Sequence, residues 1–228
     1  MSDWLGDSDG PMGEWGAFMS SELRLPRAEL AGQIAQLGEG RAIVAIAGAP
    51  GAGKSRLAAE LAEALNAQAP GVAAVVPMDG FHLDNATLLD RGLIHVKGAP
   101  EIFDIEAISS ALRALRAGDA DVAVPGFDRV ADTVVPSAHL VPARAQFVLV
   151  EGNYLLLTRA PWRDLFPCFD LTVRLDVPVE ELRARLEARW RDLGLPPEEV
   201  ARRVEENDLP NGALTVRENR GADFVIRD

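Results

Sequence analysis

The segment Gly48–Ser55 constrains this chain more than any other stretch. It reads Gly-Ala-Pro-Gly-Ala-Gly-Lys-Ser and fits the pattern G-x-x-x-x-G-K-S. The apolar run at 43–47 before it predicts a buried strand, and the run at 56–65 after it has apolar residues at helical spacing. A glycine-rich turn between a strand and a helix is typical of a loop that binds the phosphates of a nucleotide.

Each residue type in this loop has a chemical reason to be there. Glycines allow backbone angles that turn successive N–H groups toward a polyphosphate, and the following helix presents its positive dipole end to the same anion. We expect Lys54 to reach the outer phosphates and the Ser55 hydroxyl to bind Mg²⁺. The predicted phosphate contacts are Gly48, Ala49, Pro50, Gly51, Ala52, Gly53, Lys54, Ser55 and Arg56.

Composition narrows the class of protein. The net charge of −12 offers no basic surface for nucleic acid and gives no reason to expect attachment to anionic lipid. Cys168 is the sole cysteine, which excludes an intrachain disulfide and a multi-cysteine metal site. The chain has no run of about 20 apolar residues, and the acidic segment 1–10 lacks the basic start of a signal peptide. We therefore expect a cytoplasmic protein without nucleic-acid or membrane partners.

Two acidic residues follow predicted strands. Besides the run at 43–47, strands are expected at 72–78, 146–150, 171–175 and 222–226. Asp79 follows the second of the five and Glu151 follows the third. Parallel sheets bind ligands at the carboxyl ends of their strands, so both acids should face the phosphate loop. Four apolar residues before Glu151 resemble a Walker B site, where a carboxylate holds Mg²⁺. A simple turn residue is the structural alternative for each acid.

The remaining segments suggest how the chain is organised. Residues 1–24 lack periodicity and are interpreted as a loose arm, while 25–228 form a single domain. Residues 80–142 are expected to be an excursion over the substrate side, irregular at 84–103 and carrying a small hairpin at 133–141. Between these two parts, Asp104 and Gly118 are expected to begin and end a helix.

An arginine-rich helical region follows the fourth strand. A helix is predicted with its buried face made of Val179, Leu182, Leu186, Trp190 and Leu193. Its other face, together with a second short helix at 197–206, carries several arginines. These arginines could be a solvated surface paired with glutamates, or a lid that folds onto the phosphates. The hinge-like Gly194–Pro197 favours a lid at about 183–207, with Arg185 and Arg189 as its arginines.

Other nucleotide-binding classes fit less well. A GTPase normally carries an N-K-x-D motif, but Lys54 lies in the phosphate loop and Lys97, the other lysine, follows Val96. A RecA-like or AAA-type motor usually has an acid pair at its Walker B strand, whereas Glu151 is followed by Gly152. The remaining class is a compact phosphotransfer enzyme.

Five segments together resemble a known group. They occur in this order along the chain: Gly48–Ser55, Asp79–His82, Lys97–Asp104, Val150–Gly152 and Asn207–Pro210. The set resembles the uridine kinase, pantothenate kinase and phosphoribulokinase group of P-loop kinases. It is most similar to bacterial proteins labelled fructose-transport-system kinases or pantothenate-kinase-like. The resemblance covers about residues 25–228.

The resemblance carries structural and catalytic expectations. It implies an α/β fold, a P-loop NTPase with three α/β/α layers, a five-stranded parallel sheet in the order 2-3-1-4-5 and a helical lid. It implies that Asp79 is the general base, that Glu151 belongs to the Mg²⁺ site and that Arg189 is a catalytic lid arginine. Arg129 stands where pantothenate kinases have a substrate-side histidine. The expected substrate contacts are His82, Lys97, Phe127, Arg129, Tyr154 and Asn207.

The function expected from all of this is phosphoryl transfer. ATP with Mg²⁺ would donate its γ-phosphoryl group to a hydroxyl of a small molecule: a sugar, a nucleoside or a pantothenate-like acid. The alternative is a non-enzymatic nucleotide-dependent switch or regulatory ATPase. Members of this group often dimerise, so a homodimer is left open.

Overall fold

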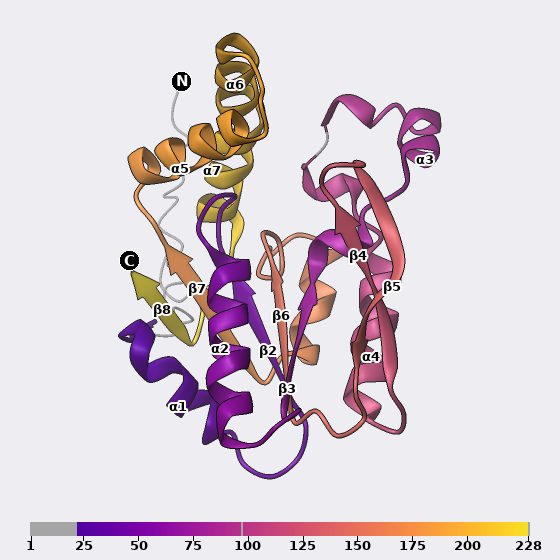
Figure 1. The fold of residues 1–228 in the computed structure, drawn as a ribbon, viewed down its shortest axis with the longest axis vertical. Coiled ribbons are helices and arrows are strands. Elements are labelled where there is room, and N and C mark those ends of the chain that lie inside the picture. The colour runs from indigo at the N-terminus through magenta and orange to yellow at the C-terminus, as the bar shows by residue number, and fades with distance from the viewer. Residues whose placement is uncertain (1–21, 97, 228) are drawn as a thin grey trace, which may run out of the picture.

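The core of the chain is a six-stranded parallel sheet (Figure 1). The computed structural model describes residues 22–96 and 98–227. The strand order is β1-β8-β7-β2-β6-β3. The strands span Leu23–Arg24 (β1), Ala42–Ala47 (β2), Ala73–Pro77 (β3), Phe147–Gly152 (β6), Leu171–Asp176 (β7) and Phe224–Arg227 (β8).

The prediction of a five-stranded sheet is wrong by one strand. The five predicted strands, numbered along the chain, lie side by side in the predicted order 2-3-1-4-5. A sixth strand, β1, is added beyond β8 at the sheet edge. Only two residues long and exposed, β1 is too short to produce a periodic signal. It is anchored by Glu22, whose Oε2 lies 2.8 Å from Nη2 of Arg174. Residues 23–24 of the predicted loose arm are therefore part of the sheet, and residues 1–21 lie outside the described part of the chain.

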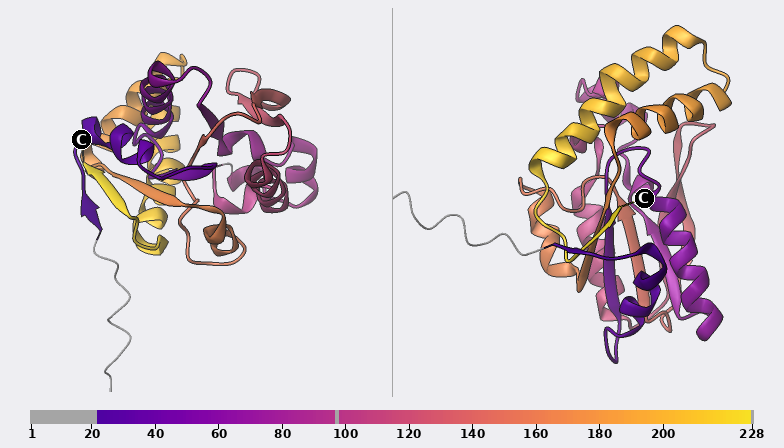
Figure 2. Two further views of the ribbon diagram at one scale, coloured as in Figure 1. Left: turned by 90° about the horizontal axis from the view of Figure 1, so that it is seen from below. Right: turned by 90° about the vertical axis from the view of Figure 1, so that its left-hand side faces the viewer.

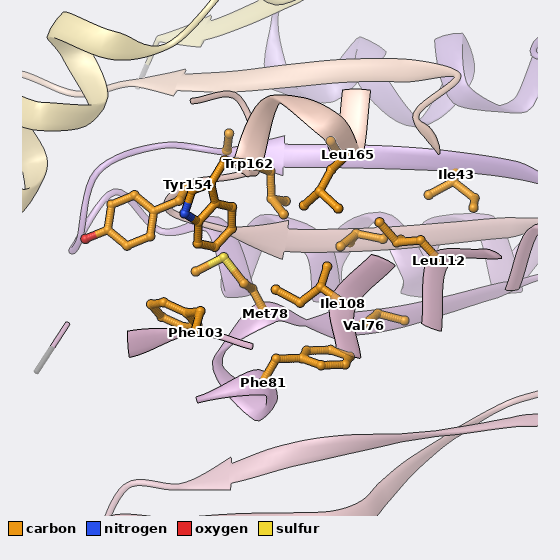
Figure 3. Close-up of a cluster of buried hydrophobic side chains, with 14 of the residues drawn as sticks. Ile43, Val76, Met78, Phe81, Phe103, Ile108, Leu112, Tyr154, Trp162 and Leu165 are labelled. Atoms are coloured by element: carbon orange, nitrogen blue, oxygen red, sulfur yellow. The ribbon is translucent and has the colours of Figure 1, made fainter. Parts of the chain in front are cut away.

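Side chains alternate between the two faces of the sheet along each strand, which creates two separate hydrophobic cores. Ile43, Ala45 and Ala47 of β2 face one buried cluster, while Val44 and Ile46 face the other. This is the side-chain period of two expected of a strand covered on both faces. Helices α1 (Leu30–Ala35) and α2 (Lys54–Gln68) cover one face, and α4 (Ile105–Ala117) covers the other. Figure 3 shows part of the cluster beneath α4.

Helix α4 has the boundaries that the sequence predicted. The Asp104 carboxylate accepts a hydrogen bond of 2.9 Å from the Ala107 N–H, and Gly118 ends the helix with a φ of +69°. These are the standard signals of an N-cap and a left-handed C-cap. Capping chemistry alone therefore located this element.

The excursion at 80–142 is more regular than predicted. A helix, α3 (Asn85–Asp90), lies in the stretch expected to be irregular, and Asp84 caps it. The predicted hairpin within 133–141 is wrong, because these residues form one strand, β5 (Thr133–Val141). It pairs antiparallel with β4 (Val122–Asp128) in a separate two-stranded sheet. Pro136 and Ser137 resemble a turn in sequence, but β5 passes through them with Ser137 at a φ of +54°.

Three helices lie beyond the carboxyl ends of the strands (Figures 1 and 2). They are α5 (Val179–Asp192), α6 (Pro197–Arg203) and α7 (Leu209–Glu218), and a π-helical turn at Val204–Asp208 joins the last two. Leu182 and Leu186 are buried as predicted, but Val179 and Leu193 are 52% and 46% exposed. The sequence analysis missed α7. Within the described residues, no helix is both long and apolar enough to cross a bilayer.

Candidate active site

The phosphate loop is closely packed. Gly51 and Gly53 adopt φ values of +79° and +92°, where glycine is favoured. A Cβ on Gly51 would lie 3.0 Å from Cγ of Leu186 in α5. The loop ends directly in α2, which begins at Lys54. The backbone conformation and the packing together explain why glycine occupies these positions.

Lys54 is buried at the start of α2. Its side chain is folded over the loop, and Nζ donates a 2.9 Å hydrogen bond to the Ala49 carbonyl. Burial lowers the pKa of Lys54, and the negative charges of Glu151 and Asp79 oppose that shift. An ammonium group has three donors, so two are available to a bound phosphate.

The exposed Ser55 and the buried Glu151 form an oxygen pair beside the lysine. The Ser55 Oγ donates a 2.8 Å hydrogen bond to Oε1 of Glu151. Burial raises the pKa of Glu151, while Lys54 acts in the opposite direction. No group of three or more His, Cys, Asp or Glu side chains in the described residues could hold a metal alone. One hydroxyl and one carboxylate suit Mg²⁺, which keeps water and phosphate oxygens as its other ligands.

Asp79 lies in a 3-10 turn directly after β3. Because Pro77 of β3 pairs with Glu151 of β6, the turn is next to the Ser55–Glu151 pair. The Asp79 carboxylate forms an ion pair with Arg129, which follows β4. A Cβ on Gly80 would lie 2.1 Å from the Pro125 carbonyl oxygen, so only glycine lets β4 approach the turn so closely.

His82 lies beside the same turn between two aromatic rings. Its ring centroid is 4.2 Å from Phe103 and 4.7 Å from Phe127. Its Nδ1 lies 2.6 Å from the Asp79 carbonyl oxygen, which requires Nδ1 to carry the proton. Burial lowers the pKa of His82 and favours the neutral ring, which leaves Nε2 as an acceptor.

The arginines predicted for the lid lie above the loop. Arg185 donates a 3.3 Å hydrogen bond to the Ala52 carbonyl and pairs with Glu181. Arg189 is half-buried, and burial is the main cause that lowers its pKa, with the positive charge of Arg129 second. Arg189 and Arg129 therefore influence each other across the cleft.

Three polar cleft residues were not singled out by the sequence analysis. Asp208 is 8% exposed and accepts a 2.6 Å hydrogen bond from Nε1 of Trp190, and burial raises its pKa. Asn211 donates to Oδ1 of Asn207 at 3.2 Å. The third residue is Asn153. Asp208 lay within a quoted motif, and the spacing of four between the two asparagines is a helical signal that could have identified Asn211.

One predicted substrate residue does not line the cleft, and another cannot be placed. Tyr154 is fully buried among Phe103 and Trp162, and its hydroxyl donates to the Gly98 carbonyl (Figure 3). It lies behind the cleft, so its predicted contact with an acceptor is not supported. Lys97 lies outside the described residues.

Most of the other predicted residues line one cleft of about 750 Å³, whereas Gly48, Ala49 and Ala52 of the phosphate loop are not part of its lining. From the predicted set, the lining contains Pro50, Gly51, Gly53, Lys54, Ser55, Arg56, Asp79, His82, Phe127, Arg129, Glu151, Arg185, Arg189 and Asn207. The phosphate-binding groups and the candidate base thus share a single space, which suits phosphoryl transfer between two bound molecules.

Comparison with known proteins assigns the family. No family model matches the chain. A Schizosaccharomyces pombe protein named "Putative uridine kinase C227.14" is 32% identical over 197 residues, which are 82% of this chain and 83% of that protein. The chain belongs to the uridine kinase-like family of P-loop kinases. A solved structure from Silicibacter sp. TM1040, titled a "putative fructose transport system kinase", is 42% identical to this kinase, covers 88% of it and 98% of the solved chain, and has a TM-score of 0.82.

A second group of relatives agrees with this assignment. A Streptomyces coelicolor pantothenate kinase is 32% identical over 159 residues, which are 66% of this kinase and 48% of that protein. These relatives are kinases, and a P-loop kinase that phosphorylates a hydroxyl of a small molecule is what the sequence predicted. The prediction of a kinase is confirmed, and the non-enzymatic alternative has no support among them.

Proposed function

We propose that this kinase transfers the γ-phosphoryl group of ATP, with Mg²⁺ bound, to an acceptor hydroxyl held at Asp79. One observation carries the proposal: Lys54, the Ser55–Glu151 pair and Asp79 line the same cleft. Lys54, Ser55 and Glu151 suit the phosphates of the donor. Asp79 suits the hydroxyl of the acceptor.

Ser55 and Glu151 would hold Mg²⁺, since their oxygens are 2.8 Å apart and are the hard ligands that this ion prefers. When bound, Mg²⁺ neutralises charge on the phosphate oxygens. The phosphate loop and Lys54 hold the donor in place. The acceptor then lies on the other side of Asp79, over His82 and Phe127.

The transfer step follows from this placement. The acceptor oxygen forms a bond to the γ-phosphorus while its proton passes to the Asp79 carboxylate. The bond from the γ-phosphorus to the bridging oxygen breaks, and its electron pair leaves with ADP. Lys54 and Arg189 stabilise the charge that spreads over the transferring group. The segment 183–207 acts as the lid that brings Arg185 and Arg189 to the phosphates.

The proposed acceptor classes are a sugar, a nucleoside and a pantothenate-like acid, because the relatives are named for kinases of such compounds. A cytoplasmic location and a homodimer are also part of the proposal. The acidic composition supports the first. The homodimer is proposed because members of this group often dimerise, and light scattering of the purified chain would test it.

The experiment is an ADP-release screen across the three acceptor classes, with matched variants. Asp79→Asn should leave ATP affinity nearly unchanged and lower kcat by about 10²–10⁴-fold, the usual contribution of a general base. Lys54→Met should weaken both ATP binding and turnover. Asp90→Asn, an exposed site at the end of α3, is the control. Full acceptor-dependent turnover by Asp79→Asn would refute the assignment of the base.

A further inference from the structure

Asp79, the candidate base, already forms an ion pair with a neighbouring side chain. Nη2 of Arg129 donates directly to Oδ2 of Asp79. A carboxylate whose charge is balanced by a guanidinium at a charge-assisted hydrogen bond is a weaker proton acceptor for a hydroxyl. Opening of the ion pair therefore makes Asp79 a stronger base for the transfer step that we propose above.

Arg129 lies on the acceptor side of Asp79. Along the carboxyl edge of the sheet, β2 with the phosphate loop comes first, then β6 with Glu151, then β3 with Asp79. The β4–β5 hairpin that carries Arg129 lies beyond β3, and Pro125 of β4 touches the turn at Gly80. Figure 1 shows this hairpin and the start of α2 on opposite sides of β3. A group that draws Arg129 away from Asp79 therefore comes from the acceptor end.

The side chain of Arg129 is free to turn toward such a group. It is 49% exposed, and Asp79 is its only ion-pair partner among the described residues. The loop beneath it is fixed, because the Asp128 carboxylate accepts 2.9 Å hydrogen bonds from the N–H groups of Val130 and Ala131. Because the loop is fixed and the guanidinium is exposed, the side chain of Arg129 can change its partner while β4 stays in place.

Beside the acidic side chains that also line the cleft, two guanidiniums offer a position for an anion. Arg189 from α5 and Arg129 from the hairpin face the same cleft, and the charge of Arg129 acts on Arg189 across it. Two guanidiniums that repel each other are stabilised together by a shared anionic group, which they bind with directional hydrogen bonds. The rings of His82 and Phe127 pack together and line the same cleft.

We propose that Arg129 binds an anionic group, a carboxylate or a phosphate, carried by the acceptor, and that this exchange of partners releases Asp79 to act as the base. The inference rests on the proposed function and narrows its acceptor to a hydroxy acid or a phosphorylated hydroxy compound. A neutral acceptor leaves Arg129 on Asp79.

The first test uses matched pairs of acceptors that differ in charge. They are D-glycerate with glycerol, pantothenate with pantothenol, and ribose 5-phosphate with ribose. The wild-type kinase should favour the charged member of any pair it phosphorylates by at least about tenfold in kcat/KM, since a hydrogen bond to a charged group contributes that much. The three pairs separate a carboxylate from a phosphate. Arg129→Gln should remove the preference, and Arg91→Gln, an exposed arginine, is the control.

The second test does not need an acceptor. Arg129→Gln frees Asp79, so ATP hydrolysis without acceptor should rise several-fold above that of wild type and Arg91→Gln. The double variant Arg129→Gln/Asp79→Asn should not show the rise. Together, the preference for charged acceptors and this rise support the proposal.

Three results would overturn the inference. They are equal turnover of a neutral and a charged member by the wild type, no rise in hydrolysis by Arg129→Gln, and a loss of ATP affinity in Arg129→Gln alone, which would assign Arg129 to the donor. The first of these results, if the turnover depends on Asp79, would overturn this inference and leave the proposed function standing. Turnover that is independent of both Asp79 and Lys54 would instead refute the proposed function.

Discussion

At the scale of single residues, the cleft holds charged groups with little contact with water. Lys54 and Glu151 are 8% and 7% exposed, and each perturbs the other. Buried charges are costly unless they are paired, and perturbed groups in a cleft are typical of functional sites. The hydrogen bonds of Ser55 and the Ala49 carbonyl reduce that cost.

His82 makes the stability of this kinase depend on pH. Burial depresses its pKa below the ordinary value of 6.5, with Arg129 adding to the effect and Asp79 and Asp132 opposing it. The unfolded chain therefore binds the proton more readily than the folded chain. The contribution of His82 to stability is fully present above about pH 6.5 and is lost as the pH falls through the folded pKa.

The measurement is urea unfolding at pH 7.5 and pH 5.5. The free energy of unfolding should fall between these values in the wild type, and by less in His82→Gln. The exposed His139 on β5 supplies the control variant His139→Gln. An equal fall in wild type and His82→Gln would contradict the prediction.

Most of the site was predictable at this scale, and Tyr154 shows where the prediction stops. The phosphate loop and Asp79 follow strands and Glu151 lies near the end of one, so the topology of a parallel sheet brings them to one edge. Tyr154 also follows a strand end, but its side chain turns back into the core beside Trp162. Spacing along the chain gives the position of a strand end. It does not give the direction of a side chain in the turn beyond it.

At the scale of elements, the contact between β4 and the turn at 78–81 depends on the missing side chain of Gly80. Gly80→Ala should destabilise the fold by about 1–3 kcal/mol, the usual effect of overpacking, because the added Cβ meets the Pro125 backbone. It should also lower kcat, because Asp79 belongs to the displaced turn.

Gly32 in α1 is the matched control, since nothing lies within 4 Å of an added Cβ there. Gly32→Ala should stabilise the chain by about 0.5–1 kcal/mol through helix propensity. Urea unfolding measures both variants. The same sign of change in both would show that the close contact at Gly80 has no energetic effect.

The elements that the sequence analysis missed had misleading local signals. Leu209-Pro210-Asn211-Gly212 resembles a turn. Here Pro210 lies in the first turn of α7, where proline is tolerated, and Gly212 lets the helix approach the phosphate loop, with an ideal Cβ 3.3 Å from Ala49. In both α7 and β5, tertiary contacts decided a conformation that local propensity alone did not favour.

At the scale of the whole molecule, β1 completes the sheet far from the chemistry. It lies at the edge opposite β3, and the Leu23 N–H donates a 3.2 Å hydrogen bond to the carbonyl of Asp223, the residue before β8. A chain that begins at residue 25 loses this bond and the Glu22–Arg174 ion pair. Its Tm should be several degrees below that of a chain that begins at residue 22, since each kcal/mol corresponds to about 2–4 °C at this size.

Differential scanning calorimetry of the two chains measures the difference, and ADP release measures activity. Both chains should phosphorylate an acceptor at similar rates below the lower Tm, because β1 contributes no residue to the cleft. An equal Tm for the two chains would mean that the sixth strand adds nothing to stability.

The hairpin of β4 and β5 shares no strand ladder with the six-stranded sheet. In the function that we propose, donor binding and acceptor choice therefore depend on two separate sheets. A change in the hairpin alters what approaches Asp79 without breaking a hydrogen bond between the strands that carry the phosphate loop and Glu151. In evolutionary terms, a family with this architecture can exchange one acceptor for another while its nucleotide machinery stays unchanged.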